Sequence, residues 1–279
     1  MKIGVFIFST EYSIRMVDLA RALEERGFES LFVPEHTHIP LSRRTPFPGG
    51  EPLPREYSNT LDPFVDLTAA AVVTRTLRIG TGICLVSQRD PIVTAKAVAS
   101  LDLISEGRFE FGIGAGWNQD ELQNHGTRYE DRFRVMVDRV KAMQAIWTGE
   151  EASYDGEFTH FEPAWSWPKP VQKPHPPILL GGETKYSLRR VMDFCDGWMP
   201  RGNFMSDPKT VMEELRGYAD EAGRDMDSIA VSVFRAPPKA DYLAKCREAG
   251  VMRVLLQLPS AGQDVVMPLL DQYAALQGA

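Results

Sequence analysis

Residues 77–117 read LRIGTGICLVSQRDPIVTAKAVASLDLISEGRFEFGIGAGW and contain one complete strand–helix–strand unit. The two ends of this stretch, 77–85 and 108–112, are short apolar runs with the composition of buried strands. Between them, apolar residues from Ile92 to Leu101 recur at helical spacing, and Asp90-Pro91 is a typical helix start. The stretch therefore predicts two parallel strands joined by a helix.

The same alternation continues in both directions along the chain. Further apolar runs predict strands at 3–9, 30–33, 177–181, 197–200, 229–234 and 251–258. Stretches with one apolar face predict further helices at 14–23, 62–74, 133–147, 188–192, 211–222, 238–249 and 262–277. We expect the buried helix faces to include Ile92 and Ala222. The pattern gives eight strands and eight helices in strict alternation.

Eight such repeats predict a (β/α)8 TIM barrel of the α/β class, because this number of parallel strands with right-handed crossovers closes into a ring. An open doubly wound sheet is the alternative. It should carry a glycine-rich phosphate motif in its first strand–helix turn, and residues 9–14 lack one. We therefore predict a single barrel domain spanning residues 1–279.

Two long connections interrupt the alternation, and long connections in compact domains are usually functional. Residues 35–61, after the second strand, are rich in proline and glycine and are predicted to form neither regular helix nor strand. Residues 149–176, before the fifth strand, contain a hairpin-like turn at 154–158 and a proline-rich linker. The first insertion follows a strand, so we expect it at the catalytic end of the barrel.

The composition excludes several classes of protein. The chain is 43% hydrophobic and 25% charged, as in soluble globular proteins, so disorder is excluded. Its formal charge of −7 disfavours nucleic acid as a partner. No apolar segment is long enough for a secretion signal or a membrane span. The widely spaced Cys84, Cys195 and Cys246 indicate neither a disulfide framework nor a zinc ribbon, so we expect a cytoplasmic protein.

Histidines follow the second predicted strand, where barrel enzymes place functional residues. In the segment 34–38, His36 and His38 would face the same side of a strand, as in a metal-dependent barrel hydrolase. The remaining histidines, at 125, 160 and 175, follow no predicted strand end, so we expect no metal site. A role for His36, beside Glu35, in proton transfer or ring positioning is favoured, because imidazole titrates near neutrality.

Glycines mark three other strand ends. Gly80 and Gly82 lie inside a buried strand, which indicates a bulge, close packing or a flat ligand. The next strand contains a Gly-x-Gly-x-Gly run at 112–116, followed by Trp117, whose ring could stack on a ligand or fill the barrel mouth. Residues 181–183, Gly-Gly-Glu, precede a helix, whose amides and dipole favour an anion such as phosphate.

Short motifs follow one another along the chain in a fixed order. They are Pro34 to Pro40, Ser42-Arg43, Pro48-Gly49-Gly50, Leu61-Asp62-Pro63-Phe64, Arg89-Asp90-Pro91, Gly114-Ala115-Gly116-Trp117, Asn124-His125-Gly126, Ser166-Trp167-Pro168-Lys169-Pro170 and Leu180-Gly181-Gly182. Together they resemble the luciferase-like monooxygenase superfamily, and within it the probable coenzyme F420-dependent oxidoreductases. The resemblance covers nearly all of the chain up to about Pro200.

The resemblance implies a deazaflavin or flavin in the barrel mouth, with its ring over a bulge in the third strand. In deazaflavin relatives this bulge carries a non-proline cis peptide, which aligns with Gly82-Ile83. The resemblance makes His36 the catalytic candidate. The implied cofactor-binding residues are Glu35, Gly82, Ile83, Gly114, Gly116, Trp117, Gly181, Gly182 and Glu183, with phosphate at the Gly181-Gly182 turn.

One position departs from the resemblance. The sugar-phosphate dehydrogenase branch has a catalytic glutamate where this chain has Trp117, so no catalytic acid is transferred and a sugar phosphate is not the expected substrate. Arg43 and Arg44 could bind an anionic substrate, but solvated loop charges are the simpler interpretation.

The sequence thus predicts an oxidoreductase that transfers a hydride between coenzyme F420 and a small organic substrate. The first alternative is an FMN-dependent monooxygenase on the same fold. The others are the metal-dependent hydrolase and a protein that binds or stores the cofactor without turnover. Relatives are often dimers or tetramers, so a homodimer or higher homo-oligomer is expected.

Overall fold

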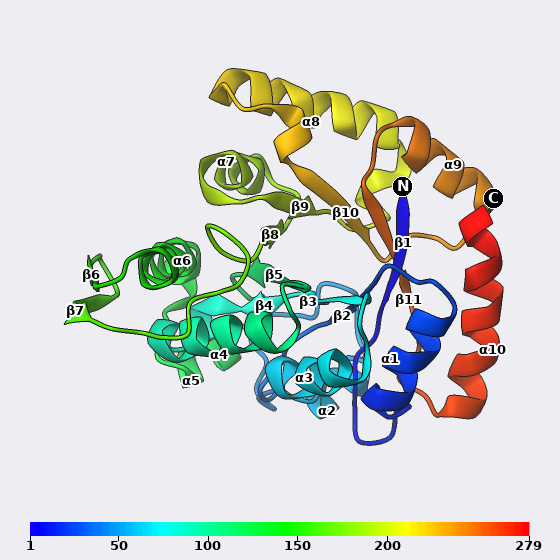
Figure 1. The fold of residues 1–279 in the computed structure, drawn as a ribbon, viewed down its shortest axis with the longest axis horizontal. Helices are drawn as coiled ribbons and strands as arrows, with labels where there is room; N and C mark the ends of the chain where they lie inside the picture. Colours follow the sequence, from blue (N-terminus) through cyan, green and yellow to red (C-terminus); the bar gives the residue numbers. More distant parts are fainter. Residues whose placement is uncertain (279) are drawn as a thin grey trace.

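The predicted strands form a closed parallel barrel, which confirms the predicted fold (Figure 1). A computed structural model describes residues 1–278 of the chain. Strands pair in the order β3-β2-β1-β11-β10-β9-β8-β5, and β5 pairs back with β3 to close the ring. The strands are β1 Lys2–Phe6, β2 Ser30–Val33, β3 Arg78–Thr81, β4 Cys84–Leu85, β5 Phe109–Gly114, β8 Ile178–Gly181, β9 Gly197–Met199, β10 Ala230–Phe234 and β11 Arg253–Gln257.

The third strand, predicted at 77–85, is broken within that run, where its glycines indicate a bulge as one interpretation. It forms β3 and β4 with a bulge at Gly82-Ile83, whose peptide bond is cis, as the resemblance implies. The Gly82 N–H still donates to the Val33 carbonyl at 2.8 Å. The Leu85 N–H donates to a carboxylate oxygen of Glu35 at 2.7 Å. The Glu35 side chain thus accepts a hydrogen bond that a neighbouring strand would otherwise accept. An apolar run alone does not reveal such a substitution of partners.

Helices surround the barrel, with the order that the sequence predicts (Figure 1). The main helices are α1 Met16–Glu25, α3 Pro63–Val73, α4 Pro91–Ile104, α6 Arg132–Thr148, α7 Lys185–Phe194, α8 Pro208–Ala222, α9 Ala240–Glu248 and α10 Gln263–Ala274. Short 3₁₀ turns lie at Val86–Gln88, Tyr129–Asp131, Phe204–Ser206, Met226–Ser228 and Ala275–Gly278. Within residues 1–278, none of the helices combines the length and the apolar content needed to cross a bilayer.

Two helices bury most of the face predicted for them, and each exposes one residue that was expected to be buried. In α4, Ile92 is 45% exposed, because the buried stripe begins at the neighbouring Pro91. In α8, Ala222 is exposed, because the stripe passes through Met212 and Ala219. Two sets of apolar positions that are offset by one residue along a helix have the same helical spacing. The sequence pattern alone therefore does not decide which of the two sets is buried.

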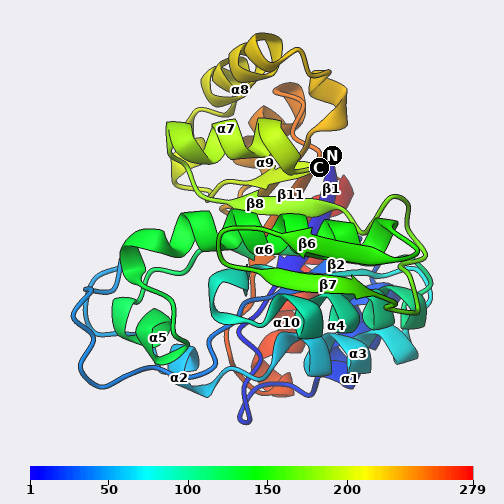
Figure 2. The same cartoon turned by 90° about the vertical axis from the view of Figure 1, so that its left-hand side faces the viewer.

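The two insertions differ in structure. In the first, residues 35–61, the prediction of no regular structure is wrong at one place, since the proline-free segment Glu56–Asn59 forms the one-turn helix α2. In the second, the predicted hairpin is confirmed as β6 Ala152–Asp155 and β7 His160–Ala164, which pair antiparallel (Figure 2). Asp138 of α6 fixes the hairpin, because its carboxylate accepts the N–H groups of Glu157 and Phe158 at 2.9 and 3.3 Å.

An ion-pair cluster closes the amino-terminal end of the barrel. The guanidinium of Arg253, the first residue of β11, is buried and donates to Glu110 and Glu29 at 2.6–2.8 Å. Burial acts to raise the pKa of Glu110, but the charges of Arg253 and Arg78 outweigh it and lower that pKa. Because this end is filled, ligands can enter the barrel only from the carboxyl ends of its strands.

Candidate active site

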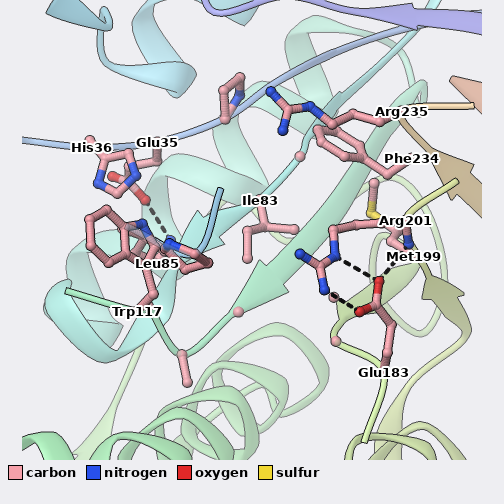
Figure 3. Close-up of a pocket in the computed structure, with 18 of the residues that line it drawn as sticks. Glu35, His36, Ile83, Leu85, Trp117, Glu183, Met199, Arg201, Phe234 and Arg235 are labelled. Carbon is pink, nitrogen blue, oxygen red and sulfur yellow. Dashed lines mark hydrogen bonds and ion pairs between the residues drawn. The ribbon is translucent and has the colours of Figure 1, made fainter. Parts of the chain in front are cut away.

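A cavity of about 410 Å³ opens at the carboxyl ends of the strands (Figure 3). This volume lies within the range of small-molecule sites. The ten residues proposed from the sequence all line it: Glu35, His36, Gly82, Ile83, Gly114, Gly116, Trp117, Gly181, Gly182 and Glu183. They come from the ends of four strands that are far apart in sequence. The barrel topology brings them together.

A buried carboxylate holds His36 in place. His36 is 8% exposed, and its Nδ1 lies 2.9 Å from Oε2 and 3.1 Å from Oε1 of Glu121. Glu121 is fully buried. Because an ionised carboxylate only accepts hydrogen bonds, Nδ1 is the protonated nitrogen and donates to Glu121. When the ring is neutral, its Nε2 atom is then left as a proton acceptor.

Sequence reasoning missed Glu121. It lies on the short helix α5, Gln119–Asn124, whose start is capped by Asn118: the amide oxygen accepts the N–H groups of Asp120 and Glu121 at 3.1 and 3.3 Å. A capping asparagine followed by two acids was the available signal. Glu121 supplies a buried carboxylate four residues after Trp117, the position at which the sequence departs from the dehydrogenase branch.

His38 does not join His36 in the cavity. Strand β2 ends at Val33, so the alternation expected for a strand does not apply to residues 34–38. The Nδ1 of His38 lies 2.9 Å from the Thr37 hydroxyl, and its Nε2 lies 2.8 Å from the side-chain nitrogen of Asn124. Within residues 1–278, no three His, Cys, Asp or Glu side chains are grouped so as to hold a metal ion.

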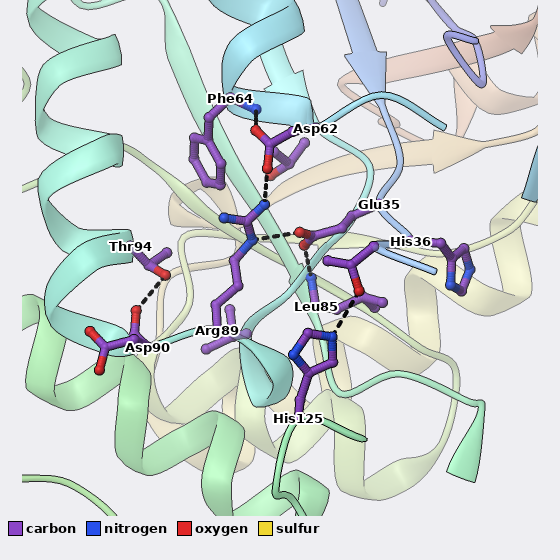
Figure 4. A network of polar contacts seen from close by, with 12 residues as sticks. Glu35, His36, Asp62, Phe64, Leu85, Arg89, Asp90, Thr94 and His125 are labelled. Atoms are coloured by element: carbon purple, nitrogen blue, oxygen red, sulfur yellow. Dashed lines mark hydrogen bonds and ion pairs between the residues drawn. The ribbon is translucent and has the colours of Figure 1, made fainter. Parts of the chain in front are cut away.

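Glu35 supports the bulge of the third strand (Figure 4). One oxygen of its buried carboxylate accepts the N–H of Leu85 at 2.7 Å, and the other accepts Nε of Arg89 at 2.5 Å. An Nη of Arg89 also donates to the carboxylate of Asp62, the N-cap of α3, at 2.5 Å. The chain from β2 is therefore tied to the bulge and to α3, and both Glu35 oxygens are engaged within the protein.

Ile83 projects from the bulge at the centre of the cavity (Figure 3). A Cβ on Gly114 would lie 2.0 Å from Cδ1 of Ile83, so Gly114 is required to make room for this side chain. A Cβ on Gly80 would lie 2.3 Å from the Phe32 ring, so close packing explains that glycine. Gly116 has φ +76°, a left-handed conformation that favours glycine.

Aromatic rings form the wall beside His36. The centroid of the Tyr57 ring lies 5.3 Å from that of the His36 ring. The centroid of the Trp117 ring lies 6.0 Å from the His36 centroid, with the two rings edge to face. Phe47 lies 4.9 Å from Tyr57 and 5.7 Å from Trp117, and Phe8 lies 4.6 Å from Tyr57. Tyr57 and Phe47 come from the first insertion, which therefore covers one side of the cavity. Phe47 lies in an irregular loop and Tyr57 on the one-turn helix α2, so neither position gave a sequence signal.

The end of β8 forms the opposite wall. Gly182 has φ +122°, and the chain then enters α7, whose N-cap Thr184 accepts the N–H of Ser187 at 3.1 Å. The carboxylate of Glu183 points to Arg201, and accepts both its backbone N–H and its Nε at 2.8 Å. The turn is therefore rigid and leads directly into a helix N-terminus that faces the cavity.

Arg43 and Arg44, the candidates for an anionic substrate, are occupied by acidic partners. Arg43 pairs with Glu51 at 3.1 Å. Arg44 donates to Asp120 through its backbone N–H at 2.7 Å and through Nε at 2.5 Å. These contacts lower the pKa of Asp120. Both arginines serve to fix the insertion, and neither lines the cavity.

The family described as luciferase-like monooxygenase has a sequence model that matches residues 1–264 of this chain. The chain belongs to this family. The uncharacterized protein Rv0953c of Mycobacterium tuberculosis is 39% identical over 281 residues, covering 99% of this chain and 98% of that protein. The crystal structure of monooxygenase RslO1 from Streptomyces bottropensis has the same fold, with a TM-score of 0.80, 20% identity and coverage of 99% and 98% of the two chains.

Two further relatives of this chain are named for two different cofactors. The F420-dependent hydroxymycolic acid dehydrogenase of Mycobacterium tuberculosis is 23% identical, covering 90% of this chain and 66% of that enzyme. The FMNH2-dependent dimethylsulfone monooxygenase of Pseudomonas putida is 28% identical, covering 52% of this chain and 40% of that enzyme. The family therefore contains oxidoreductases and monooxygenases that depend on either coenzyme F420 or FMN.

Proposed function

We propose that this protein is an F420-dependent oxidoreductase that transfers a hydride to or from a small organic substrate. The observation that carries the proposal is the His36–Glu121 pair on the cavity wall. It places Nε2 of His36, a proton acceptor when the ring is neutral, in a cavity lined largely by apolar residues. Interconversion of an alcohol and a carbonyl compound requires a proton acceptor as well as a hydride acceptor.

Two features of the cavity support the proposed deazaflavin. Ile83 and the glycines around it offer a flat apolar surface for one face of a ring, and the turn at Gly181-Gly182 offers backbone amides and a helix N-terminus for its phosphate. When bound, the coenzyme supplies the carbon that accepts or gives the hydride. Gly82, Gly114, Gly116, Trp117 and Glu183 complete the proposed binding wall, and Glu35 acts by holding the bulge.

The chain's own residues handle the proton and the water. In the oxidising direction, Nε2 of His36 takes the hydroxyl proton of the substrate while its C–O bond becomes a carbonyl. Glu121 keeps the ring oriented and stabilises the positive charge that forms on it. The proton then passes to solvent. The aromatic wall of Phe8, Phe47, Tyr57 and Trp117 excludes water from the reacting atoms.

An FMN-dependent monooxygenase is the second candidate. The similarity to the dimethylsulfone monooxygenase favours it, but that match covers only 52% of this chain. The match to the F420-dependent dehydrogenase covers 90% and includes the second half of the barrel, where the phosphate turn lies. The wider match is the reason to place coenzyme F420 first.

Equilibrium titration of the purified protein with each cofactor tests the choice. We expect coenzyme F420 to bind at least tenfold more tightly than FMN. With F420H2, a panel of aldehydes and ketones should be reduced without oxygen consumption. Tighter binding of FMN, together with oxygen uptake in the presence of FMNH2, would reverse the assignment.

The expected homo-oligomer is part of the proposal. Helices α3 and α4 carry apolar side chains on their outer faces, among them Val65 at 73% and Val93 at 65% exposure. A helix that is apolar all round normally lies in an interior or an interface. We propose that a second copy of the chain covers this surface.

A further inference from the structure

Two arginines line the cavity at the ends of β9 and β10, across from His36 (Figure 3). Arg201 follows β9 and forms a β-bridge with Phe234, so Arg235 lies on the neighbouring segment. The Gly202 N–H donates to the Phe234 carbonyl at 2.6 Å and fixes the two segments together. Arg235 has φ +58°, a left-handed conformation that residues other than glycine rarely adopt. The fold holds its guanidinium here despite that unfavourable conformation.

The two guanidinium groups differ in their partners. Arg201 is neutralised by Glu183, with one Nη 2.5 Å from the second carboxylate oxygen. Arg235 has no carboxylate within ion-pair distance in the part of the chain that the structure describes, residues 1–278; its Nε donates to the amide oxygen of Gln257 at 3.1 Å. In a chain with a net charge of −7, one uncompensated positive charge therefore lies on the cavity wall.

A buried phenol lies beside this charge. Tyr57 is 8% exposed. Burial raises the pKa of Tyr57, while the charges of the nearby Arg235 and Arg201 oppose the rise. The phenol is therefore neutral and keeps its proton near neutral pH. A phenolic O–H and a guanidinium both donate hydrogen bonds, and two such donors facing one cavity suit an anion.

We propose that Arg235, with the Tyr57 hydroxyl beside it, binds an anionic group of the substrate, such as a carboxylate. The substrate is then an organic anion with an apolar body. Its charged end lies at β10, its body lies between the other face of the coenzyme ring and the aromatic wall, and its reacting oxygen lies at His36. This inference rests on the proposed function, because it assigns the cofactor phosphate to the turn at Gly181-Gly182.

That assignment leaves Arg235 for the substrate. Arg201 is tied to Glu183, the residue that directly follows the phosphate turn, so its charge belongs to the β8 side of the cavity. Arg235 is anchored by Gln257 of β11 and approaches Tyr57 of the first insertion. The insertion covers the cavity opening, where a substrate enters. A charge placed there selects the substrate.

Calorimetric titration with benzoate and with benzamide tests the proposal. The two probes have the same shape, and only benzoate is charged. Wild type, Arg235→Gln, Arg235→Lys and Arg55→Gln are compared, each with and without coenzyme F420. Arg55 is the control, because it is an exposed arginine of the first insertion and does not line the cavity. Thermal unfolding shows whether each variant is folded.

We expect wild type to bind benzoate at least tenfold more tightly than benzamide. Arg235→Gln should abolish that preference and leave benzamide binding unchanged, Arg235→Lys should retain part of it, and Arg55→Gln should retain all of it. The proposal is overturned if wild type shows no preference or binds neither probe, or if folded Arg235→Gln keeps the preference. It is also overturned if Arg235→Gln weakens coenzyme F420 binding tenfold instead, because the charge then serves the cofactor. A lack of coenzyme F420 binding in every form, with the benzoate preference intact, would contradict only the proposed function.

Discussion

His36 has one nitrogen committed to Glu121 and one available to a substrate, and this difference between its two nitrogens is the chemical basis of the proposed mechanism. A histidine in a loop can rotate about its side-chain bonds and exchange tautomers. The bond from Nδ1 to a fully buried carboxylate removes both freedoms. Orientation of this kind is lost when the carboxylate becomes an amide, because an amide can donate to Nδ1 and favour the other tautomer.

Glu121→Gln should therefore lower kcat by about 10²-fold with little change in KM. His36→Asn should lower kcat to a similar extent, and the double variant should be no worse than either single one, because the two residues act as a unit. Steady-state kinetics on a substrate from the carbonyl panel give these values, with the exposed Glu130→Gln as control. Additive losses in the double variant would show that the pair does not act together.

Gly114 tests the surface on which the ring is proposed to lie. In Gly114→Ala, the new Cβ would overlap Cδ1 of Ile83 and push that side chain into the cavity. We expect coenzyme F420 affinity to fall at least tenfold and the free energy of unfolding to fall by about 1–3 kcal/mol. Gly217→Ala is the matched control, because Gly217 is inside helix α8 and a Cβ added there would meet no atom within 4 Å. It should bind normally, and unchanged binding in Gly114→Ala would contradict the placement.

Individual residues were predictable from sequence where strand ends could be counted. His36 and Gly182 follow predicted strands, Ile83 was indicated by the resemblance inside the predicted strand 77–85, and topology then places all three on one cavity. Glu121 and Tyr57 lie on helices of one or two turns, which are too short to show a periodicity. Their place in the site depends on how the loops fold back over the barrel, and this is decided by contacts between residues distant in sequence.

Helix α3 contains a carboxyl group that the barrel buries at a cost. Asp66 is 6% exposed, and one of its oxygens has no hydrogen-bond partner within residues 1–278. Burial raises the pKa of Asp66 from 3.8 to about 6, and the charge of Asp62 adds to the rise. The folded state thus binds this proton more tightly than the unfolded state. The contribution of this tighter proton binding to the free energy of unfolding is complete below about pH 3.8. It is lost as the pH rises through about 6.

Asp66→Asn should therefore stabilise the protein at high pH. At pH 8 the variant should be about 3 kcal/mol more stable than wild type, and near pH 4 the difference should nearly vanish. Chemical unfolding followed by circular dichroism at the two pH values measures this, and the exposed Asp220→Asn is the control. An equal difference between variant and wild type at both pH values would show that Asp66 does not titrate in this range.

The elements themselves were largely predictable, and the exceptions have a common cause. Apolar runs and helix caps located each barrel strand and main helix to within a few residues. The glycines in the run 77–85 left a bulge as one of three interpretations, because the break between β3 and β4 depends on the Glu35 carboxylate and on the absence of a side chain at Gly112. A Cβ on Gly112 would lie 1.9 Å from the Thr81 carbonyl oxygen. Such features depend on neighbouring strands, which local patterns do not describe.

At the scale of the whole molecule, the barrel is filled by side chains at its amino-terminal end and contains the candidate active-site cavity at its carboxyl-terminal end. The Arg253 cluster fills the amino-terminal end, while the insertion after β2 covers part of the carboxyl-terminal end. The closure of the ring follows from the count of alternating elements, which the sequence provides. The association of whole chains does not follow from it, since exposed apolar side chains indicate a contact without naming the partner.

The proposed dimer predicts the effect of charge on the outer face of α3 and α4. Val65→Glu combined with Val93→Glu should convert a particle of twice the chain mass into a monomer, measured by light scattering after size-exclusion chromatography. Val265→Glu, on α10, is the control, because Val265 is also exposed and lies on another helix. An oligomer that survives the double substitution would place the interface elsewhere.

The most direct test of the proposed function is a crystal structure of the protein soaked with coenzyme F420. The account predicts electron density for the ring with one face against Ile83, the phosphate at the amides of Gly181 and Gly182, and Nε2 of His36 facing the reactive side. Density for the cofactor at another site, or a cavity that stays empty at saturating cofactor, would contradict it.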